Sequence, residues 1–162
     1  MLTVMTALSN RSQNHAGART HRDGARPLSD PLVLVVEDHD DTLFLLTYLL
    51  GMRGCRVQVA RDGEQAVRMA EAELPDLVLM DISLPRLDGL QATRRMRETE
   101  SLRTIPVVFI SGHAEASFRA QALSQGGDDY LVKPFTVGQI ERIVQRFLGE
   151  SAAGQSIPGS PE

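Results

Sequence analysis

Short apolar runs alternate with amphipathic segments along the central part of this chain. The runs cover residues 32–36, 57–60, 77–80, 107–110 and 130–132, and each has the length and the Val, Leu and Ile content of a strand. Helical patterns lie between and after them, at residues 40–52, 63–72, 88–98, 114–124 and 136–148. Strict alternation of strands and helices predicts a doubly wound α/β fold, in which helices cover both faces of a parallel sheet.

The five strand–helix units are expected to form one domain over residues 31–149. Units of this size fit a flavodoxin-like, five-stranded sheet with strand order 2-1-3-4-5. Residues 1–30 lack apolar periodicity, so a disordered N-terminal tail is predicted there. Residues 150–162 are rich in Gly, Pro and Ser and are predicted to form a flexible C-terminal tail. The true start is open between Met1 and Met5.

Composition narrows the function classes. The chain has a net charge of −4, and its first thirty residues hold four arginines against two aspartates, which leaves −6 for the rest. An acidic domain argues against direct nucleic-acid binding, because phosphate contacts need clustered Lys and Arg. One cysteine, Cys55, allows no internal disulfide, and no apolar run approaches the roughly 18–20 residues of a membrane span. A cytoplasmic protein without membrane insertion is therefore expected.

Polar side chains stand where four of the predicted strands end. Glu37 and Asp38 follow the first strand, Asp81 the third, Ser111 the fourth and Lys133 the fifth. In open parallel sheets, ligands bind at this carboxyl edge. Acids gathered there repel one another, and a divalent cation such as Mg²⁺, which prefers hard oxygen ligands, would relieve that repulsion.

Lys133 is unusual because it is the only lysine among seventeen cationic residues. Arginine serves every other cationic position, so this position favours a compact point charge on a flexible stem. Such a charge suits a phosphate or carboxylate oxygen at a crowded site.

The motifs at these strand ends resemble those of response-regulator receiver domains of two-component signalling, close to the chemotaxis regulator. The similar segments are Val35-Val36-Glu37-Asp38, Asp81-Ile82-Ser83-Leu84-Pro85 with Asp88-Gly89, Ile110-Ser111-Gly112, and Asp128-Asp129-Tyr130-Leu131-Val132-Lys133-Pro134-Phe135. Ser111 and Lys133 follow Asp81 by 30 and 52 residues, as in that family.

The resemblance implies roles for these residues. Asp81 would accept a phosphoryl group from a phosphohistidine. Asp38, Asp81 and the backbone carbonyl of Ser83 would hold Mg²⁺, with Glu37 bound through water or positioning the ion. Lys133 would neutralise charge on the transferring oxygens, and Ser111 would bind the new phosphate.

The resemblance also implies a switch and two contact surfaces. Tyr130 matches the switch aromatic, which turns inward when the hydroxyl of Ser111 moves, and His113 occupies a position that influences phosphate lifetime. Output is expected on the face of the fourth helix, fifth strand and fifth helix. The first helix carries a second apolar stripe beside its core stripe, which is proposed to dock the kinase or phosphotransfer protein; it comprises Phe44, Tyr48 and Met52.

The expected function is a single-domain response regulator, a signalling switch and not an enzyme. It would signal to an unknown output protein by contact or pass the phosphoryl group along a relay. A receiver fragment of a hybrid kinase is an alternative. A haloacid-dehalogenase-like phosphatase with Asp81 as nucleophile needs a second acid two residues later, where this chain has Ser83. A flavodoxin-like nucleotide or flavin binder needs a Gly/Ser/Thr loop after the first strand, where the acidic pair lies.

Overall fold

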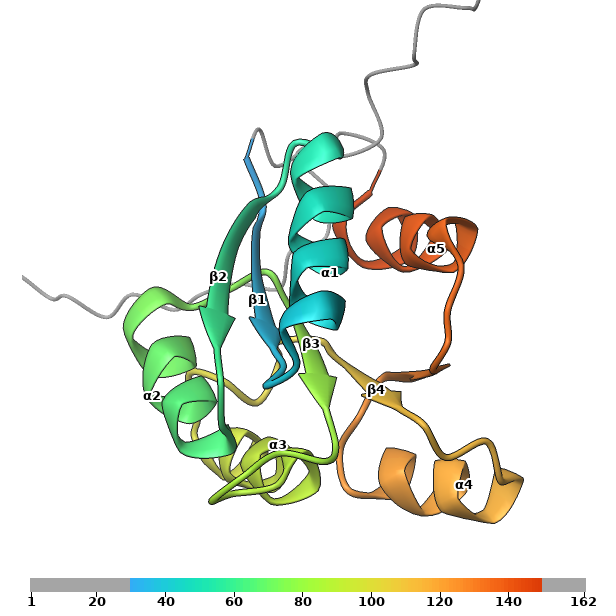
Figure 1. Ribbon diagram of the computed structural model, residues 1–162. Coiled ribbons are helices and arrows are strands. Elements are labelled where there is room, and N and C mark those ends of the chain that lie inside the picture. Colours follow the sequence, from blue (N-terminus) through green and yellow to red (C-terminus); the bar gives the residue numbers. More distant parts are fainter. Residues whose placement is uncertain (1–29, 150–162) are drawn as a thin grey trace, which may run out of the picture.

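The computed structural model describes residues 30–149, so the predicted tails lie outside this range except for residue 30 (Figure 1). The strands are β1 (Leu32–Val36), β2 (Arg56–Ala60), β3 (Leu77–Asp81), β4 (Val107–Ser111) and β5 (Asp129–Val132). The helices are α1 (Asp40–Met52), α2 (Gly63–Glu73), α3 (Gly89–Glu98), α4 (Ala116–Ser124) and α5 (Val137–Leu148). All strand pairs are parallel and their order is β2-β1-β3-β4-β5, which confirms the predicted flavodoxin-like α/β fold.

Two hydrophobic cores lie on opposite faces of the sheet. Side chains alternate along a strand, so Val33 and Val35 enter one core while Leu34 and Val36 enter the other. Helices α1 and α5 cover the first face, and α2, α3 and α4 cover the second (Figure 1). Strands β1, β3 and β4 are buried along their whole length, as their continuous apolar runs predict.

Local capping explains where several helices begin. The carboxylates of Asp62 and Asp88 accept the backbone N–H groups of the third residues of α2 and α3, so the helices begin one residue after these caps. Thr136 and Gln139 form a reciprocal capping box at the start of α5. Three helices, predicted at residues 88–98, 114–124 and 136–148, begin one or two residues later in the structure than predicted. Their first predicted residues are helix caps or loop residues.

Strands β3 and β4 are one residue longer than predicted, and the extra residues are Asp81 and Ser111. Both side chains are buried and polar. Each is thus fixed by strand hydrogen bonding at the carboxyl edge of the sheet. Within residues 30–149, no helix has the length and apolar content needed to cross a membrane.

Candidate functional site

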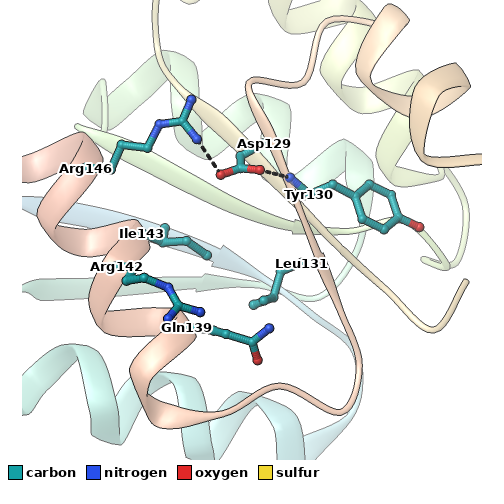
Figure 2. Close-up of a pocket in the computed structure, with 7 residues that line it drawn as sticks. All are labelled: Asp129, Tyr130, Leu131, Gln139, Arg142, Ile143 and Arg146. Atoms are coloured by element: carbon teal, nitrogen blue, oxygen red, sulfur yellow. Dashed lines mark hydrogen bonds and ion pairs between the residues drawn. The ribbon is translucent and has the colours of Figure 1, made fainter. Parts of the chain in front are cut away.

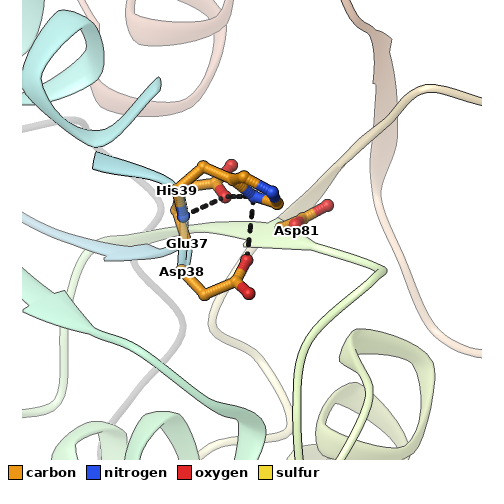
Figure 3. A group of neighbouring side chains, drawn as sticks. All are labelled: Glu37, Asp38, His39 and Asp81. Atoms are coloured by element: carbon orange, nitrogen blue, oxygen red, sulfur yellow. Dashed lines mark hydrogen bonds and ion pairs between the residues drawn. The ribbon is translucent and has the colours of Figure 1, made fainter. Parts of the chain in front are cut away.

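Acidic side chains from two adjacent strands meet at the carboxyl edge of the sheet. Strands β1 and β3 pair with Val36 opposite Met80. The residues that follow these two, Glu37 and Asp81, therefore lie side by side. One ligand atom from each of Glu37, Asp38, His39 and Asp81 lies within 4.8 Å of the others (Figure 3). Glu37 and Asp81 are buried, so their charges are held in a poorly solvated place.

Lys133 supplies the positive charge of this cluster. Its Nζ donates to Glu37 Oε2 at 2.6 Å and lies 3.6 Å from Asp81 Oδ1. Burial acts to raise the pKa of Glu37, but the hydrogen bonds from Lys133 and from the His39 N–H prevail and hold this pKa below its ordinary value. Glu37 is therefore ionised at neutral pH and anchors the lysine beside Asp81.

Asp81 has the opposite electrostatic balance. Burial, followed by the nearby charge of Glu37, raises the pKa of Asp81 above its ordinary value, although Lys133 opposes this effect. Its Oδ1 accepts the Ser83 N–H at 3.3 Å. Its buried Oδ2 has no hydrogen-bond partner among the residues the structure describes. A buried carboxylate oxygen without a partner is costly unless a further ligand satisfies it.

Gly89, at the end of the loop after β3, packs closely against the backbone of Asp81 and Ile82. The Gly89 N–H donates to Ile82 O at 3.0 Å, and a Cβ at position 89 would lie 2.1 Å from the backbone oxygen of Asp81. Only glycine permits this approach. Arg86 takes a left-handed conformation with φ of 63°, which turns the loop back toward the start of α3.

Ser111 lies one strand away from Asp81, at the end of β4. Its carbonyl accepts the Lys133 N–H at 2.8 Å, so the backbones that carry the hydroxyl and the lysine are joined. The buried Oγ accepts the N–H of His113 at 3.1 Å and lies 3.2 Å from His113 Nδ1. The serine hydroxyl is thus engaged by its own loop.

The predicted switch aromatic points inward. Tyr130 is buried, and its hydroxyl donates to the carbonyl of His113 at 2.8 Å. The loop that follows Ser111 is therefore bonded both to the end of β4 and to the side chain of Tyr130 on β5.

The predicted docking stripe on α1 lies open to solvent. Phe44, Tyr48 and Met52 are 73%, 58% and 50% exposed, and the rings of the first two stack at 6.4 Å between centroids. The other predicted stripe, which includes Leu43, Leu46 and Leu50, is buried against the sheet. The helix thus keeps a large apolar surface outside the core.

Two residues near the site were missed by sequence reasoning. His39 Nδ1 lies 3.1 Å from Glu37 Oε1 and 3.0 Å from Asp38 Oδ1, and these contacts, with Glu37 first, raise the pKa of the imidazole. Its place directly after the acidic pair was a usable signal. Phe118 on α4 stacks on His113 at 4.5 Å between centroids, a contact that no spacing in the sequence indicates.

The donor set fits a hard divalent cation. Three carboxylates converge, one of them is a third exposed, and the unsatisfied Asp81 oxygen belongs to the same cluster. Mg²⁺ binds through one or two carboxylates and completes its shell with water, which the exposed side of Asp38 allows. The cluster can therefore hold such an ion.

This topology, with acids, a hydroxyl and a lysine at the ends of β1, β3, β4 and β5, is the arrangement that the sequence motifs predict for a receiver domain. Residues 33–145 match the family model described as response regulator receiver domain. The chain belongs to this family and is a receiver domain of two-component signalling.

Curated relatives cover several protein types. The chain is 34% identical over 119 residues to the alkaline phosphatase synthesis transcriptional regulatory protein PhoP of Bacillus subtilis, a match covering 74% of this chain and 49% of that protein. It is 38% identical over 128 residues to the sensor protein GacS of Pseudomonas syringae, a match covering 76% of this chain and 14% of that protein. The chain thus spans about half the length of one relative and a seventh of the other.

A shorter relative and a solved structure match over most of their own length. An uncharacterized 14.6 kDa protein of Leptolyngbya boryana is 36% identical over 115 residues, covering 71% of this chain and 88% of that protein. The solved receiver domain of a Pseudomonas aeruginosa sensor histidine kinase is 39% identical, with a TM-score of 0.70. The match covers 74% of this chain and 98% of that structure. That structure has a magnesium ion coordinated in its active site cleft.

Proposed function

We propose that this protein is a single-domain response regulator that accepts a phosphoryl group on Asp81. The observation that carries the proposal is the convergence of Lys133, Glu37 and Asp38 on a buried aspartate whose Oδ2 has no partner in the described part of the chain. Phosphoryl transfer asks a protein mainly to position the nucleophile and to stabilise charge, and this site provides both.

The reaction follows from these groups. A carboxylate oxygen of Asp81 forms a P–O bond while the P–N bond of a donor phosphohistidine breaks, and the bonding electron pair returns to the donor imidazole. The Lys133 ammonium is held by Glu37 and lies 3.6 Å from Asp81, so it would neutralise charge on the oxygens of the transferring group. Asp38, Asp81 and the Ser83 carbonyl would hold Mg²⁺, with Glu37 bound through water or positioning the ion. When bound, Mg²⁺ would supply positive charge beside the transferring oxygens and so stabilise their negative charge.

The phosphorylated state needs new hydrogen bonds. Phosphorylation brings roughly −1.5 to −2 charge and three acceptor oxygens. Lys133, 3.6 Å from Asp81, and Ser111, at the end of the adjacent strand, would bind these oxygens. Tyr130 would respond because its hydroxyl is bonded to the loop after Ser111. The loop and Tyr130 thus form the element whose equilibrium the phosphoryl group shifts.

Output is proposed on the face formed by α4, β5 and α5. A cavity of about 290 Å³ lies there, between β5 and α5 (Figure 2). Arg146 pairs with Asp129 at 2.7 Å, whereas Arg142 forms no ion pair within the described range. The floor includes the buried Leu131 and Ile143. A partner segment with a carboxylate beside an apolar side chain would complement this cavity.

The phosphoryl donor is proposed to be a histidine kinase or a histidine phosphotransfer protein, docked on Phe44, Tyr48 and Met52 of α1. The stripe is exposed and lies on the helix that begins four residues after β1, beside the acidic pair. We place the protein in the cytoplasm, where such donors act, without direct contact to nucleic acid, and assign it no turnover beyond its own phosphorylation and dephosphorylation. A hybrid-kinase fragment would use the same site.

Intact-mass spectrometry after treatment with acetyl phosphate and Mg²⁺ tests the proposal. We expect one phosphoryl adduct on the parent protein, its loss when Mg²⁺ is chelated, and no adduct on Asp81→Asn. Asp41→Asn, which alters an exposed aspartate in the first turn of α1, serves as a control that keeps the adduct. An adduct on Asp81→Asn, or none on the parent with any donor, would refute the assignment.

A further inference from the structure

His113 contacts two parts of the proposed switch. Its backbone N–H donates to Ser111 Oγ at 3.1 Å, and its Nδ1 lies 3.2 Å from the same oxygen. Its carbonyl accepts the hydroxyl of Tyr130 at 2.8 Å. The residue therefore lies between the hydroxyl at the end of β4 and the inward-pointing aromatic of β5.

The imidazole of His113 also contacts α4. It stacks on Phe118 with 4.5 Å between ring centroids and 24° between ring planes. Phe118 in turn packs against the core beneath α2, α3 and α4. His113 is thus the side chain through which the Ser111 hydroxyl is connected to a helix of the output face.

The Ser111 hydroxyl cannot donate to His113 Nδ1 and to a phosphoryl oxygen at the same time. A hydroxyl has one proton to donate, and here its oxygen already accepts the His113 N–H. When Nδ1 carries no proton, it is an acceptor at hydrogen-bond distance for the serine proton. A phosphoryl oxygen is also an acceptor, so Ser111 can donate to the phosphoryl group only by leaving Nδ1.

We infer that His113 is a positioning residue that holds the Ser111 hydroxyl before phosphorylation and transmits its release to α4 through Phe118. The inference rests on the proposed function. When Ser111 turns to a phosphoryl oxygen on Asp81, the imidazole loses its partner, and the ring and the helix stacked on it are free to shift. This route to α4 depends on the side chains at positions 113 and 118 and adds to the backbone contact with Tyr130.

Two substitutions separate the hydrogen bond from the ring contact. His113→Asn retains an oxygen that can accept from Ser111 but lacks the ring, whereas His113→Phe retains the ring but lacks the acceptor. His113 is exposed, so both variants are expected to fold as the parent does. Phe118→Ala removes the contact from the α4 side.

The probe is beryllofluoride with Mg²⁺, which occupies the place of a phosphoryl group on a carboxylate. Affinity is measured by titration, and backbone amide NMR shifts are followed at Lys133 and along α4 at saturation. A net neutral hydrogen bond corresponds to about a fivefold change in an equilibrium constant. We therefore expect His113→Phe to bind about fivefold more tightly and His113→Asn to bind like the parent. The α4 shifts should be largely lost in both variants and in Phe118→Ala, and the double variant His113→Asn with Phe118→Ala should lose no more.

The outcomes distinguish this inference from the proposed function. If the Lys133 amide of the parent does not respond, or responds equally in Asp81→Asn, the proposed phosphoacceptor site is wrong. If Lys133 responds throughout while both His113 variants keep the full α4 shifts, the backbone carries the signal and the imidazole does not. Unchanged or weaker beryllofluoride binding by His113→Phe would overturn the competition for the Ser111 proton.

Discussion

At the scale of single residues, the pair formed by Glu37 and Lys133 decides the electrostatics of the site. Glu37 is 1% exposed, and its carboxylate is kept ionised by the lysine, which is itself 24% exposed. A buried ion pair adds little net stability, but removal of one partner leaves an uncompensated charge. The lysine therefore stabilises the Glu37 charge, in addition to the role proposed for it toward the phosphoryl group.

Lys133→Met is expected to lower the free energy of unfolding by about 3 kcal/mol at neutral pH, because it strands the Glu37 charge. In the parent the pKa of Glu37 is lowered, so the stabilising contribution is present above the ordinary value of 4.5 and is lost as the pH falls through the folded-state pKa. The difference between variant and parent should accordingly shrink in acid. Urea unfolding at a series of pH values measures it.

Two control variants belong to this measurement. Adding Glu37→Gln to Lys133→Met should restore most of the lost stability, because the buried Glu37 charge that the lysine neutralised is then removed as well. Arg56→Met removes one partner of the exposed pair between Arg56 and Asp30, 2.9 Å apart, and should cost less than about 1 kcal/mol. If Lys133→Met and Arg56→Met lower the free energy of unfolding equally, the burial of Glu37 does not contribute to the cost of removing its partner.

At the scale of elements, the turn from β3 into α3 shows how a loop places a functional side chain. The start of α3 lies so close to the end of β3 that position 89 has no room for a Cβ against the backbone oxygen of Asp81. Gly63 at the start of α2 approaches Leu87 O of the same loop equally closely. The loop is therefore held between two helix N-termini.

Gly89→Ala is expected to lower the free energy of unfolding by about 1–3 kcal/mol, because the contact is with backbone that must move. The displacement falls on Asp81, so phosphorylation by acetyl phosphate should slow as well. Thermal unfolding and the rate of adduct formation measure the two effects.

Gly138→Ala in α5 is the matched control: its Cβ meets nothing within 4 Å, and it should stabilise the protein by about 0.5–1 kcal/mol. A fully active, stable Gly89→Ala variant would contradict the account of the turn.

Helix α1 divides its apolar residues between the core and solvent, and the exposed stripe leads to a prediction about donor choice. Phe44→Ala should change stability by less than about 0.5 kcal/mol, because the ring is exposed. Phosphorylation by a histidine kinase that recognises the parent should fall about tenfold, the loss typical of a truncated interface aromatic. Phosphorylation by acetyl phosphate should not change.

The comparison needs a second exposed apolar residue away from α1. Val137 at the start of α5 is 51% exposed, and Val137→Ala should leave both donors effective. If Phe44→Ala and the parent accept phosphoryl groups from the kinase at the same rate, α1 does not provide the docking surface.

At the scale of the whole molecule, the parallel sheet creates the site by bringing the carboxyl ends of four strands to one edge. Two cores, one on each face, hold these strands in register. The energetic consequence is a repulsive group of acids that the fold tolerates, with the pKa of Asp81 raised by burial and by Glu37. A bound cation should therefore stabilise the folded protein.

Mg²⁺ is expected to raise the stability of the parent by about 2.7 kcal/mol when present at about a hundredfold its dissociation constant. The effect needs ionised carboxylates. It should therefore vanish as the pH falls through the raised pKa of Asp81, at a higher pH than an ordinary aspartate would give. Thermal unfolding with and without Mg²⁺ measures it. Asp38→Asn should reduce the gain, and Asp41→Asn, at an exposed position in the first turn of α1, should not. A gain that persists in Asp81→Asn would place the ion elsewhere.

Much of this architecture is readable from local patterns. Continuous apolar runs predict strands buried on both faces, and strict alternation with helices predicts parallel pairing, because crossovers are right-handed and short. The polar residues that end these runs must share one edge of the sheet. The sequence alone therefore predicts that these residues are neighbours: Glu37, Asp38, Asp81, Ser111 and Lys133.

The amino-acid sequence by itself determined the class of fold and the residue types at the site, because hydrophobic periodicity is a local property. The strand order 2-1-3-4-5 was expected from the likeness to flavodoxin-like sheets, and the strand pairing confirms it. The tertiary structure alone decided how the side chains pair: Lys133 with Glu37, the Ser111 hydroxyl with His113, and the His113 ring with Phe118. These contacts depend on rotamers and on the distance between loops packed on separate elements. No spacing along the chain contains that information, since it arises only when the two cores have closed.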